Sequence, residues 1–229
     1  MGGPVNILAI ETATTAAAIG LATSAGERVE IIVDDNRHHT ESLVPGIRDL
    51  LASAGIGAKY IDRVVVDRGP GLYTGLRVGI ATAVGFALAA NCELVGVTSL
   101  EVLAAGAHRA SIRRTLLVAV DGRRGEVFIQ SFELADVVMP TSDPAVAQPA
   151  DVASQWASRG AVTLTGDGMT RYAGEFDSLA NATLFEQRVP PPLEALELGA
   201  TREPELSITP LYLREPDAVA NFSTRERSS

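Results

Sequence analysis

The chain has 229 residues, which is long enough to bury one large core or two small ones. Its 28 acidic and 19 basic residues give a formal net charge of −9, and the sequence has no lysine-rich run or tail. This balance speaks against free-standing nucleic-acid binding, which normally needs a basic patch. A single cysteine, Cys92, excludes an internal disulfide bond and is typical of a cytoplasmic protein.

Arginine outnumbers lysine 18 to 1, and several arginines gather near the middle of the chain. They are Arg109, Arg113, Arg114, Arg123 and Arg124. Because the composition already favours arginine, we interpret this cluster first as a solvated face. No basic leader segment is expected, and Arg77 interrupts the longest apolar segment, so a membrane-spanning helix is not expected either.

The first predicted elements are strands over 5–10, 16–23 and 28–33, because apolar residues alternate there between turn signals. An amphipathic helix should follow over 42–54, with Ser42 as its N-cap and an apolar stripe on one side. Pro45 fits the first turn of such a helix; otherwise it would kink the helix.

Residues 68–79 are the most informative part of the chain, because they join a short apolar strand to a helix that is rich in small residues. The strand is predicted over 64–66, and residues 69–71 (Gly-Pro-Gly) form a sharp turn. The helix should begin after Thr74 as N-cap and run to about Asn91. It has two neighbouring stripes, Gly75, Gly79, Ala83 and Ala87 on one and Leu76, Ile80, Val84 and Leu88 on the other.

A helix with so little polar surface must be covered nearly all round. Two interpretations stay open at this stage. In the first, the small residues pack closely against the chain's own sheet. In the second, they let a helix of another subunit approach closely. An uncovered stripe would also favour a homodimer.

A strand is predicted over 94–97, and Thr98 and Glu101 have capping-box spacing at the start of a helix that reaches about His108. A hairpin over 115–134 should start a second unit, with 121–125 as its turn. The element order indicates the actin-like and sugar-kinase ATPase half-domain, although other mixed-sheet α/β folds remain possible.

A proline-rich surface loop over 140–149, a strand over 162–165 and a late strand over 211–213 complete the predicted elements. The expected organisation is an N-terminal actin-like domain over 1–108, a smaller α/β domain over 109–210 and a C-terminal tail over 211–229.

Several segments, in order, resemble the bacterial TsaB (YeaZ) family of tRNA threonylcarbamoyladenosine biosynthesis. They are 7–14 (ILAIETAT), His39 with 43–45 (LVP), 68–71 (RGPG) with 74–77 (TGLR), 96–100 (GVTSL), 125–128 (GEVF) and 210–214 (PLYLR). A single Gly-Pro-Gly turn would be weak, but these segments together span most of the chain.

The resemblance implies two actin-like domains, the second reduced, in a subunit with no catalytic residues, metal or cofactor of its own. A larger TsaD-like subunit would hold the metal and the catalytic site, a small TsaE-like ATPase would bind ATP, and tRNA would be reached only through the complex. The family joins its subunits through helices of the first domain. The corresponding residues here are Ser42, Leu43, Ile47, Leu50, Thr74, Gly75, Leu76, Arg77, Gly79, Ile80, Ala83 and Val84.

The actin-like phosphate loop is predicted to be degenerate in this chain. Its residues would be Glu11, Thr12, Thr14, Gly69 and Gly71. An ATPase needs glycine in the hairpin turn after the acidic strand end, so that backbone amides reach the phosphates, and the turn here supplies hydroxyls instead. Against the family pattern, Glu11 replaces a more usual aspartate, Asp67 a frequent glycine and Gly122 a usual alanine, and the two acids disfavour a phosphate.

Other chemistries find little support. The three histidines, His38, His39 and His108, offer an adjacent pair and a distant residue, which does not match metal-ligand spacing on a helix. We expect His39 to contact Glu41 or a backbone carbonyl. No nucleophile-elbow motif is present. The prediction is therefore an activating subunit, with a self-standing actin-like ATP-binding protein as the alternative.

Overall fold

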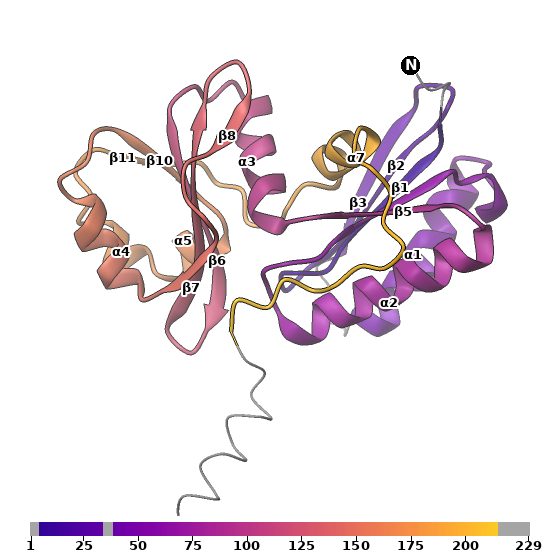
Figure 1. Cartoon of the computed structure of the whole chain (residues 1–229), viewed down its shortest axis with the longest axis horizontal. Helices are drawn as coiled ribbons and strands as arrows, with labels where there is room; N and C mark the ends of the chain where they lie inside the picture. The colour runs from indigo at the N-terminus through magenta and orange to yellow at the C-terminus, as the bar shows by residue number, and fades with distance from the viewer. Residues whose placement is uncertain (1–4, 34–38, 215–229) are drawn as a thin grey trace, which may run out of the picture.

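The computed structural model describes residues 5–33 and 39–214, except the side chains of 33 and 39–41. It contains two mixed sheets that lie side by side (Figure 1). The first sheet has the order β3-β2-β1-β4-β5, and the second has the order β11-β10-β6-β7-β8, with β9 also pairing with β7. The strands of the first sheet are β1 (Ile7–Glu11), β2 (Ala17–Ala22), β3 (Arg28–Val33), β4 (Arg63–Asp67) and β5 (Glu93–Val97).

The second sheet is built around the predicted hairpin, which is confirmed, and the predicted strand over 162–165 is present as β10. Its strands are β6 (Thr115–Arg123), β7 (Glu126–Leu134), β8 (Val138–Pro140), β9 (Ala145–Ala147), β10 (Val162–Thr165) and β11 (Ala182–Leu184). Two antiparallel strands next to parallel ones in each sheet give the mixed α/β architecture of two actin-like domains.

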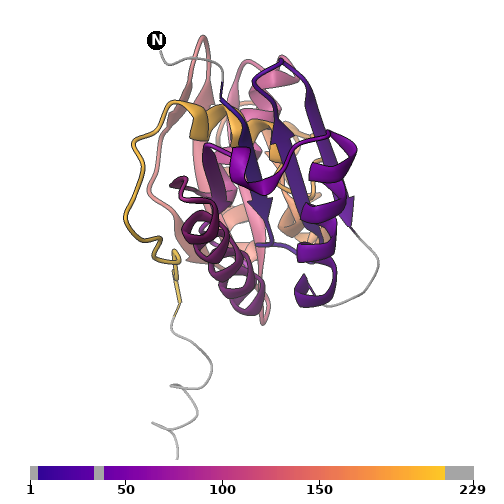
Figure 2. The ribbon, with the colours of Figure 1, turned by 90° about the vertical axis from the view of Figure 1, so that its right-hand side faces the viewer.

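Helices cover both faces of the first sheet. On one face lie α1 (His39–Ser53) and α2 (Tyr73–Ala90), side by side in Figure 2, with the short 3₁₀ turn η1 (Ala58–Tyr60) between them in the chain. On the other face lies α7 (Pro192–Ala200), which contacts β1 and β2. This helix falls within the range expected for the second domain, but the chain returns to the first sheet after β11.

The second sheet also has two covered faces. One is packed by α3 (Ser99–Arg109), which lies between the two sheets in Figure 1. The other is packed by α4 (Pro149–Trp156), α5 (Asp167–Arg171) and α6 (Ala173–Phe176). Alternate residues of β6 point to opposite faces of the sheet. Leu116 packs in the core with α3, and Leu117 packs in the core with α4.

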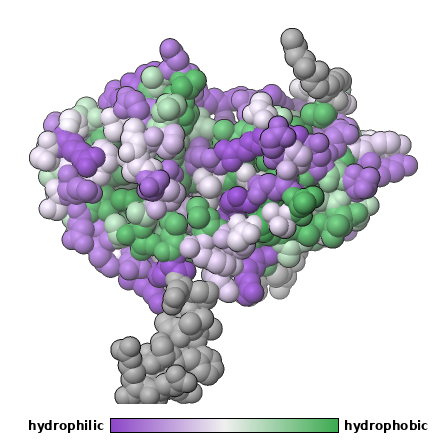
Figure 3. Space-filling view, viewed as in Figure 1, coloured by the Kyte–Doolittle hydropathy of each residue, from purple (hydrophilic) through white to green (hydrophobic). Residues whose placement is uncertain are grey.

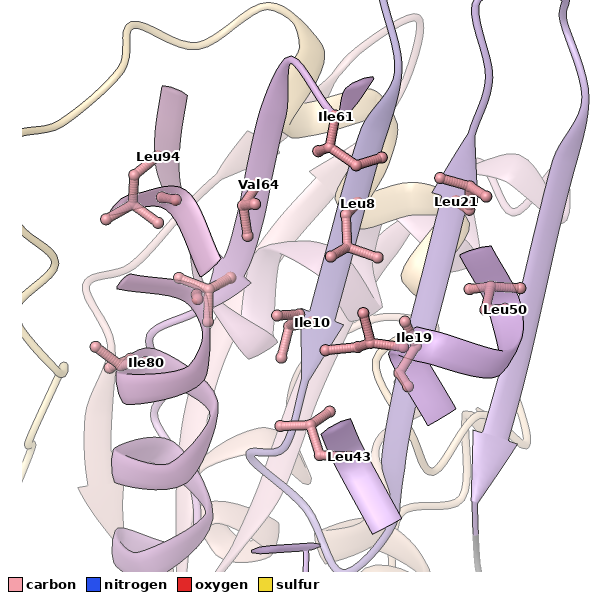
Figure 4. Close-up of a cluster of buried hydrophobic side chains, with 14 of the residues drawn as sticks. Leu8, Ile10, Ile19, Leu21, Leu43, Leu50, Ile61, Val64, Ile80 and Leu94 are labelled. Atoms are coloured by element: carbon pink, nitrogen blue, oxygen red, sulfur yellow. The ribbon is translucent and has the colours of Figure 1, made fainter. Parts of the chain in front are cut away.

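The first core shows the same alternation. Leu8 and Ile10 of β1 point toward α1 and α2, where they meet Leu43 and Ile80 (Figure 4). Ile7 packs on the opposite face with residues of α7. Strands buried on both faces read as continuous apolar runs, which explains why these segments are so hydrophobic.

Three predicted boundaries are wrong. Helix α1 begins at His39, so Ser42 is not its cap and Pro45 lies inside the helix, where it cannot donate a backbone hydrogen bond. Helix α2 begins at Tyr73 with Leu72 as N-cap, two residues before the predicted cap Thr74. The loop predicted over 140–149 contains β9. The capping box of Thr98 and α3 is confirmed.

The late strand predicted over 211–213 is also wrong. Leu211 donates one backbone hydrogen bond of 2.7 Å to Arg68, and Pro210 has no N–H with which to extend a ladder. Instead, the segment after α7 runs along the edge of the first sheet and past α2 (Figure 1). Glu205 fastens it by a backbone bond of 2.7 Å to Leu94 and an ion pair of 2.5 Å with Arg68.

The small-residue stripe of α2 faces the chain's own hairpin after β1. Gly75 and Gly79 are buried, and the Gly75 carbonyl accepts a hydrogen bond of 2.8 Å from Thr12 Oγ1. A Cβ added at Gly79 would overlap the same Oγ1. The first interpretation of the stripe, close packing within the chain, therefore describes this contact.

Gly79→Ala should lower the melting temperature, because Thr12 is β-branched and held by its hydrogen bond, and overpacking of a core costs about 1–3 kcal/mol. Gly85→Ala is the matched control, since no described atom lies within 4 Å of a Cβ added there. The control should gain about 0.5–1 kcal/mol from helix propensity. Circular dichroism melts check both, and a Gly79→Ala protein as stable as wild type would contradict the packing described.

Candidate functional site

Two buried carboxyl groups lie where the phosphate loop of an actin-like fold would be. β1 and β4 are parallel neighbours, so their last residues, Glu11 and Asp67, reach the same edge of the sheet. Glu11 Oε1 accepts a hydrogen bond of 2.6 Å from the Ala13 amide. Asp67 Oδ1 accepts 2.6 Å from the Gly69 amide and 2.9 Å from Ser99 Oγ. Each carboxyl group thus ties a strand end to the loop that follows it.

Burial raises the pKa of Glu11 well above its usual value, and the charge of Asp67 raises it further. Burial also raises the pKa of Asp67. Asp67 Oδ2 has no donor among the described residues other than a protonated Glu11. The geometry therefore fits one proton shared between the two side chains, which leaves a single negative charge in the core.

The hairpin turn itself is covered by protein. Glu11, Thr12 and Thr14 are each 2% exposed or less. The Ala13 carbonyl accepts a hydrogen bond of 2.7 Å from the Leu72 amide, and a Cβ at Gly71 would overlap that carbonyl. The residues predicted as a degenerate phosphate loop are thus brought together, but as a packed contact between the turn, the Gly69–Gly71 loop and α2. Gly69 has φ +104°, which explains the glycine there.

The second domain presents further acids toward this position. Asp121, at the end of β6, accepts a bond of 2.9 Å from the Arg123 amide, and Asp167 Oδ1 accepts 2.9 Å from the Asp121 amide. Burial raises the pKa of Asp167 to about 6. The charge of Asp167 contributes to the raised pKa of Glu11, so acids from both domains face the same region. Such a setting repels a phosphate.

A groove between α1 and α2 is the main apolar hollow of the first domain. It has a volume of about 530 Å³. Its lining is almost entirely apolar and comes from α1, α2 and the segment between them: Val44, Ile47, Arg48, Leu51, Ala52, Ile56, Ala58, Ala81, Thr82, Gly85 and Phe86. Figure 3 shows hydrophobic side chains gathered over α2.

The residues predicted for the partner interface divide into two sets. Leu43, Leu50, Leu76 and Ala83 are at most 3% exposed and belong to the chain's own core, as do Ile47, Gly75, Gly79 and Ile80. Thr74 and Arg77 are exposed, and Ser42 and Val84 are partly exposed. The stripes chosen from sequence therefore lie mainly on the inner side of the helices.

Of the outer side of α2, pattern reasoning named only Leu88 and missed Ala81 and Gly85. This side exposes Ala81, Gly85 and Leu88, the last with 78% of its surface accessible. Their spacing of three and four residues is a helical stripe of its own, and α2 carries its apolar character all round. That third stripe was the available signal.

The guanidinium of Arg77 lies 4.9 Å from the centroid of the Tyr73 ring. The described part of the chain holds no group of three or more histidine, cysteine, aspartate and glutamate side chains that could bind a metal. His38, and the predicted contact of His39 with Glu41, lie outside the described residues and side chains.

Comparison with known proteins places this geometry in a family. The sequence model of the family described as TsaD: tRNA N6-adenosine threonylcarbamoyltransferase matches residues 33–177. The tRNA threonylcarbamoyladenosine biosynthesis protein TsaB of Escherichia coli K12 is 35% identical over 127 residues, covering 56% of this chain and 54% of that protein. A Pseudomonas aeruginosa crystal structure described as similar to peptidase YeaZ superposes with a TM-score of 0.79 at 28% identity, covering 92% of this chain and all of that one.

The chain belongs to the TsaB (YeaZ) family. The resemblance inferred from sequence is thus confirmed, and with it the actin-like fold. The chain spans about half the length of the named TsaB relatives it matches first. It matches Mb3455c of Mycobacterium bovis over 93% of both chains at 34% identity.

Glu11→Gln should preserve the fold of this TsaB-family chain. It should also reduce the fall in the free energy of unfolding as pH rises. A raised folded pKa means that Glu11 contributes stability fully below its ordinary value of 4.5 and loses it as pH rises through the folded pKa. Glutamine copies the protonated form, accepting from Ala13 and donating to Asp67. Urea unfolding between about pH 4.5 and about pH 8 measures this.

Glu11→Ala, which removes both bonds, should instead cost about 1–3 kcal/mol. Exposed Glu27→Gln is the charge-matched control and should leave the profile unchanged. A shared proton is ruled out by a Glu11→Gln profile that follows wild type at every pH.

Proposed function

We propose that this chain is a non-catalytic subunit that binds and activates a TsaD-like threonylcarbamoyltransferase. The reaction would be formation of N6-threonylcarbamoyladenosine at adenosine 37 of tRNAs that read codons beginning with A. The names of the TsaB relatives support the pathway. The match to the TsaD family sequence model fits a partner of related fold.

The observation that carries the proposal is the unequal burial of α2. Its mean hydropathy is 1.3 over 18 residues, high enough to pass for a membrane span, yet only 33% of the helix is buried within the chain. An amphipathic surface helix would expose polar residues. The exposed side of α2 instead continues into the apolar groove with α1, so a protein partner is the covering that suits it.

The hairpin explains why catalysis is assigned to the partner. Thr12 and Thr14 are buried, and Glu11 with Asp67 adds negative charge where a phosphate would lie. We therefore place ATP and metal on the partners, a TsaE-like ATPase and the TsaD-like subunit, in a cytoplasmic complex. A homodimer through the same groove would cover it in the absence of the partner.

Reconstitution tests the proposal. Purified chain, TsaD-like subunit, TsaE-like ATPase and threonylcarbamoyl donor should modify a tRNA transcript, and omission of this chain should abolish product. ATP turnover by the isolated chain would support the alternative of a self-standing actin-like ATPase. Product formed equally well without the chain would refute the activating role.

Gly85→Glu should weaken binding to the TsaD-like subunit by at least tenfold, because it places a charge in the apolar groove that the partner must desolvate. The fold should survive, since a Cβ at this position meets no described atom within 4 Å. Ala150→Glu, at an exposed position of α4, is the matched control and should bind as wild type. Isothermal titration measures both, and normal binding by a folded Gly85→Glu protein would remove the groove from the interface.

A further inference from the structure

A second hollow lies between the two domains, where the N-terminus of α2, the β6–β7 turn and the segment after α7 meet. We call it the arginine cleft. It has a volume of about 450 Å³. Its lining residues are Gly71, Leu72, Tyr73, Thr74, Arg77, Gly122, Arg123, Arg124, Phe128, Leu211, Tyr212, Leu213 and Arg214. None of the degenerate phosphate-loop hairpin 11–15 lines it, so it is separate from the packed acids.

The charge of the cleft is opposite to that of the chain. Four of its lining residues are arginines and none is acidic, in a protein with a net charge of −9. Two of these arginines form ion pairs with carboxylates that do not line the cleft. Arg214 lies 2.6 Å from Glu126, and Arg123 lies 3.3 Å from Asp121. A guanidinium has five N–H donors, so these pairs orient the side chains and leave donors for a ligand.

The start of α2 adds to this positive character. Its N-cap, Leu72, supplies no side-chain hydrogen bond, and no acid occupies the first turn. The first amides of this 18-residue helix have no side-chain cap, and the residues at its start, Leu72, Tyr73 and Thr74, line the cleft. Together with the arginines, this helix end favours an anionic ligand such as a phosphate.

Aromatic rings line the same cleft. Tyr73 and Tyr212 stack with ring centroids 5.0 Å apart, and each is 39% exposed. Arg77 lies over the Tyr73 ring. Tyr212 belongs to the segment after α7, which is fixed at Leu211 by its bond to Arg68, so the ring is held at the cleft by backbone. Exposed aromatic rings beside arginines are the surface on which unpaired bases stack.

We propose that the arginine cleft binds a single-stranded segment of RNA, with phosphates on the arginines and a base against the tyrosines. This rests on the proposed function, since a role in tRNA modification is what supplies an RNA. The low basic content of the chain does not oppose it, because the positive groups are concentrated in one hollow. Contacts of this kind are tolerant of sequence and modest in affinity, with a dissociation constant of about 10⁻⁴ to 10⁻⁶ M.

Fluorescence anisotropy with a labelled single-stranded RNA of about ten nucleotides tests the inference on the full-length isolated chain. A plot of the logarithm of the binding constant against the logarithm of the salt concentration should be linear. Its slope should be negative, with a magnitude of about 0.7 for each phosphate contacted. Arg123→Gln should reduce that slope by about 0.7 and weaken binding by about fivefold at low salt. Tyr212→Leu should weaken it by about fivefold or more, through lost stacking.

Arg159→Gln is the matched control, because it removes the same charge from an exposed arginine that follows α4, lies over Trp156 and does not line the cleft. It should bind RNA as wild type. Equal binding by all three variants would overturn the proposal. So would displacement of the RNA by AMP at equal nucleotide concentration, which would indicate a mononucleotide site, or by a polyglutamate peptide of equal charge, which would indicate unspecific anion binding.

Failure of this inference is distinguishable from failure of the proposed function. Arg123 and Tyr212 do not line the α1–α2 groove, so both cleft variants should bind the TsaD-like subunit as wild type. We expect Gly85→Glu to lose binding to the partner and to keep binding to RNA. We expect Arg123→Gln to keep binding to the partner and to bind RNA more weakly.

Discussion

The structure depends on the close contact between α2 and the turn after β1. Gly71, Gly75 and Gly79 bring backbone against Thr12 and Ala13, and any side chain at two of these glycines would collide with the turn. The contact does three things at once. It buries the turn after β1, it fixes α2 against the first sheet, and it places the small-residue stripe of α2 inside the chain.

The small residues of α2 pack against its own domain. The other residues of the helix therefore form the surface that α2 exposes. Leu76 and Ile80 enter the core beside that stripe, and the other two thirds of the helix residues are half-buried or exposed. A helix of this composition is costly to leave in water. The contact that packs the turn after β1 thus also determines which side of α2 is left as an apolar surface, and that surface fits the proposed docking role.

Sequence reasoning succeeded where a local pattern has one structural meaning. The strands with β-branched runs, the Thr98 capping box and the hairpin around residues 121–125 were all predictable. Helix starts were missed where Pro45 and Leu72 defy the usual capping preferences. The late strand failed because Leu211 reads as β-forming but finds only Arg68 to pair with. The direction in which each stripe of α2 faces is a tertiary fact, and a helix that is apolar all round does not reveal it.

The separation of charge between the two hollows follows from the same geometry. The acids at the ends of β1 and β4, Glu11 and Asp67, are buried, and burial favours a proton shared between them over full ionisation of both. The arginines of the β6–β7 turn stay at the surface, because Arg123 and Arg124 adopt positive φ in a turn that projects past the sheet. A positively lined hollow is therefore present between the two domains, and none of the buried acids lines it. The α1–α2 groove and the arginine cleft share no lining residue, so the proposed docking surface and the proposed RNA-binding surface can be changed independently by mutation, at Gly85 and at Arg123.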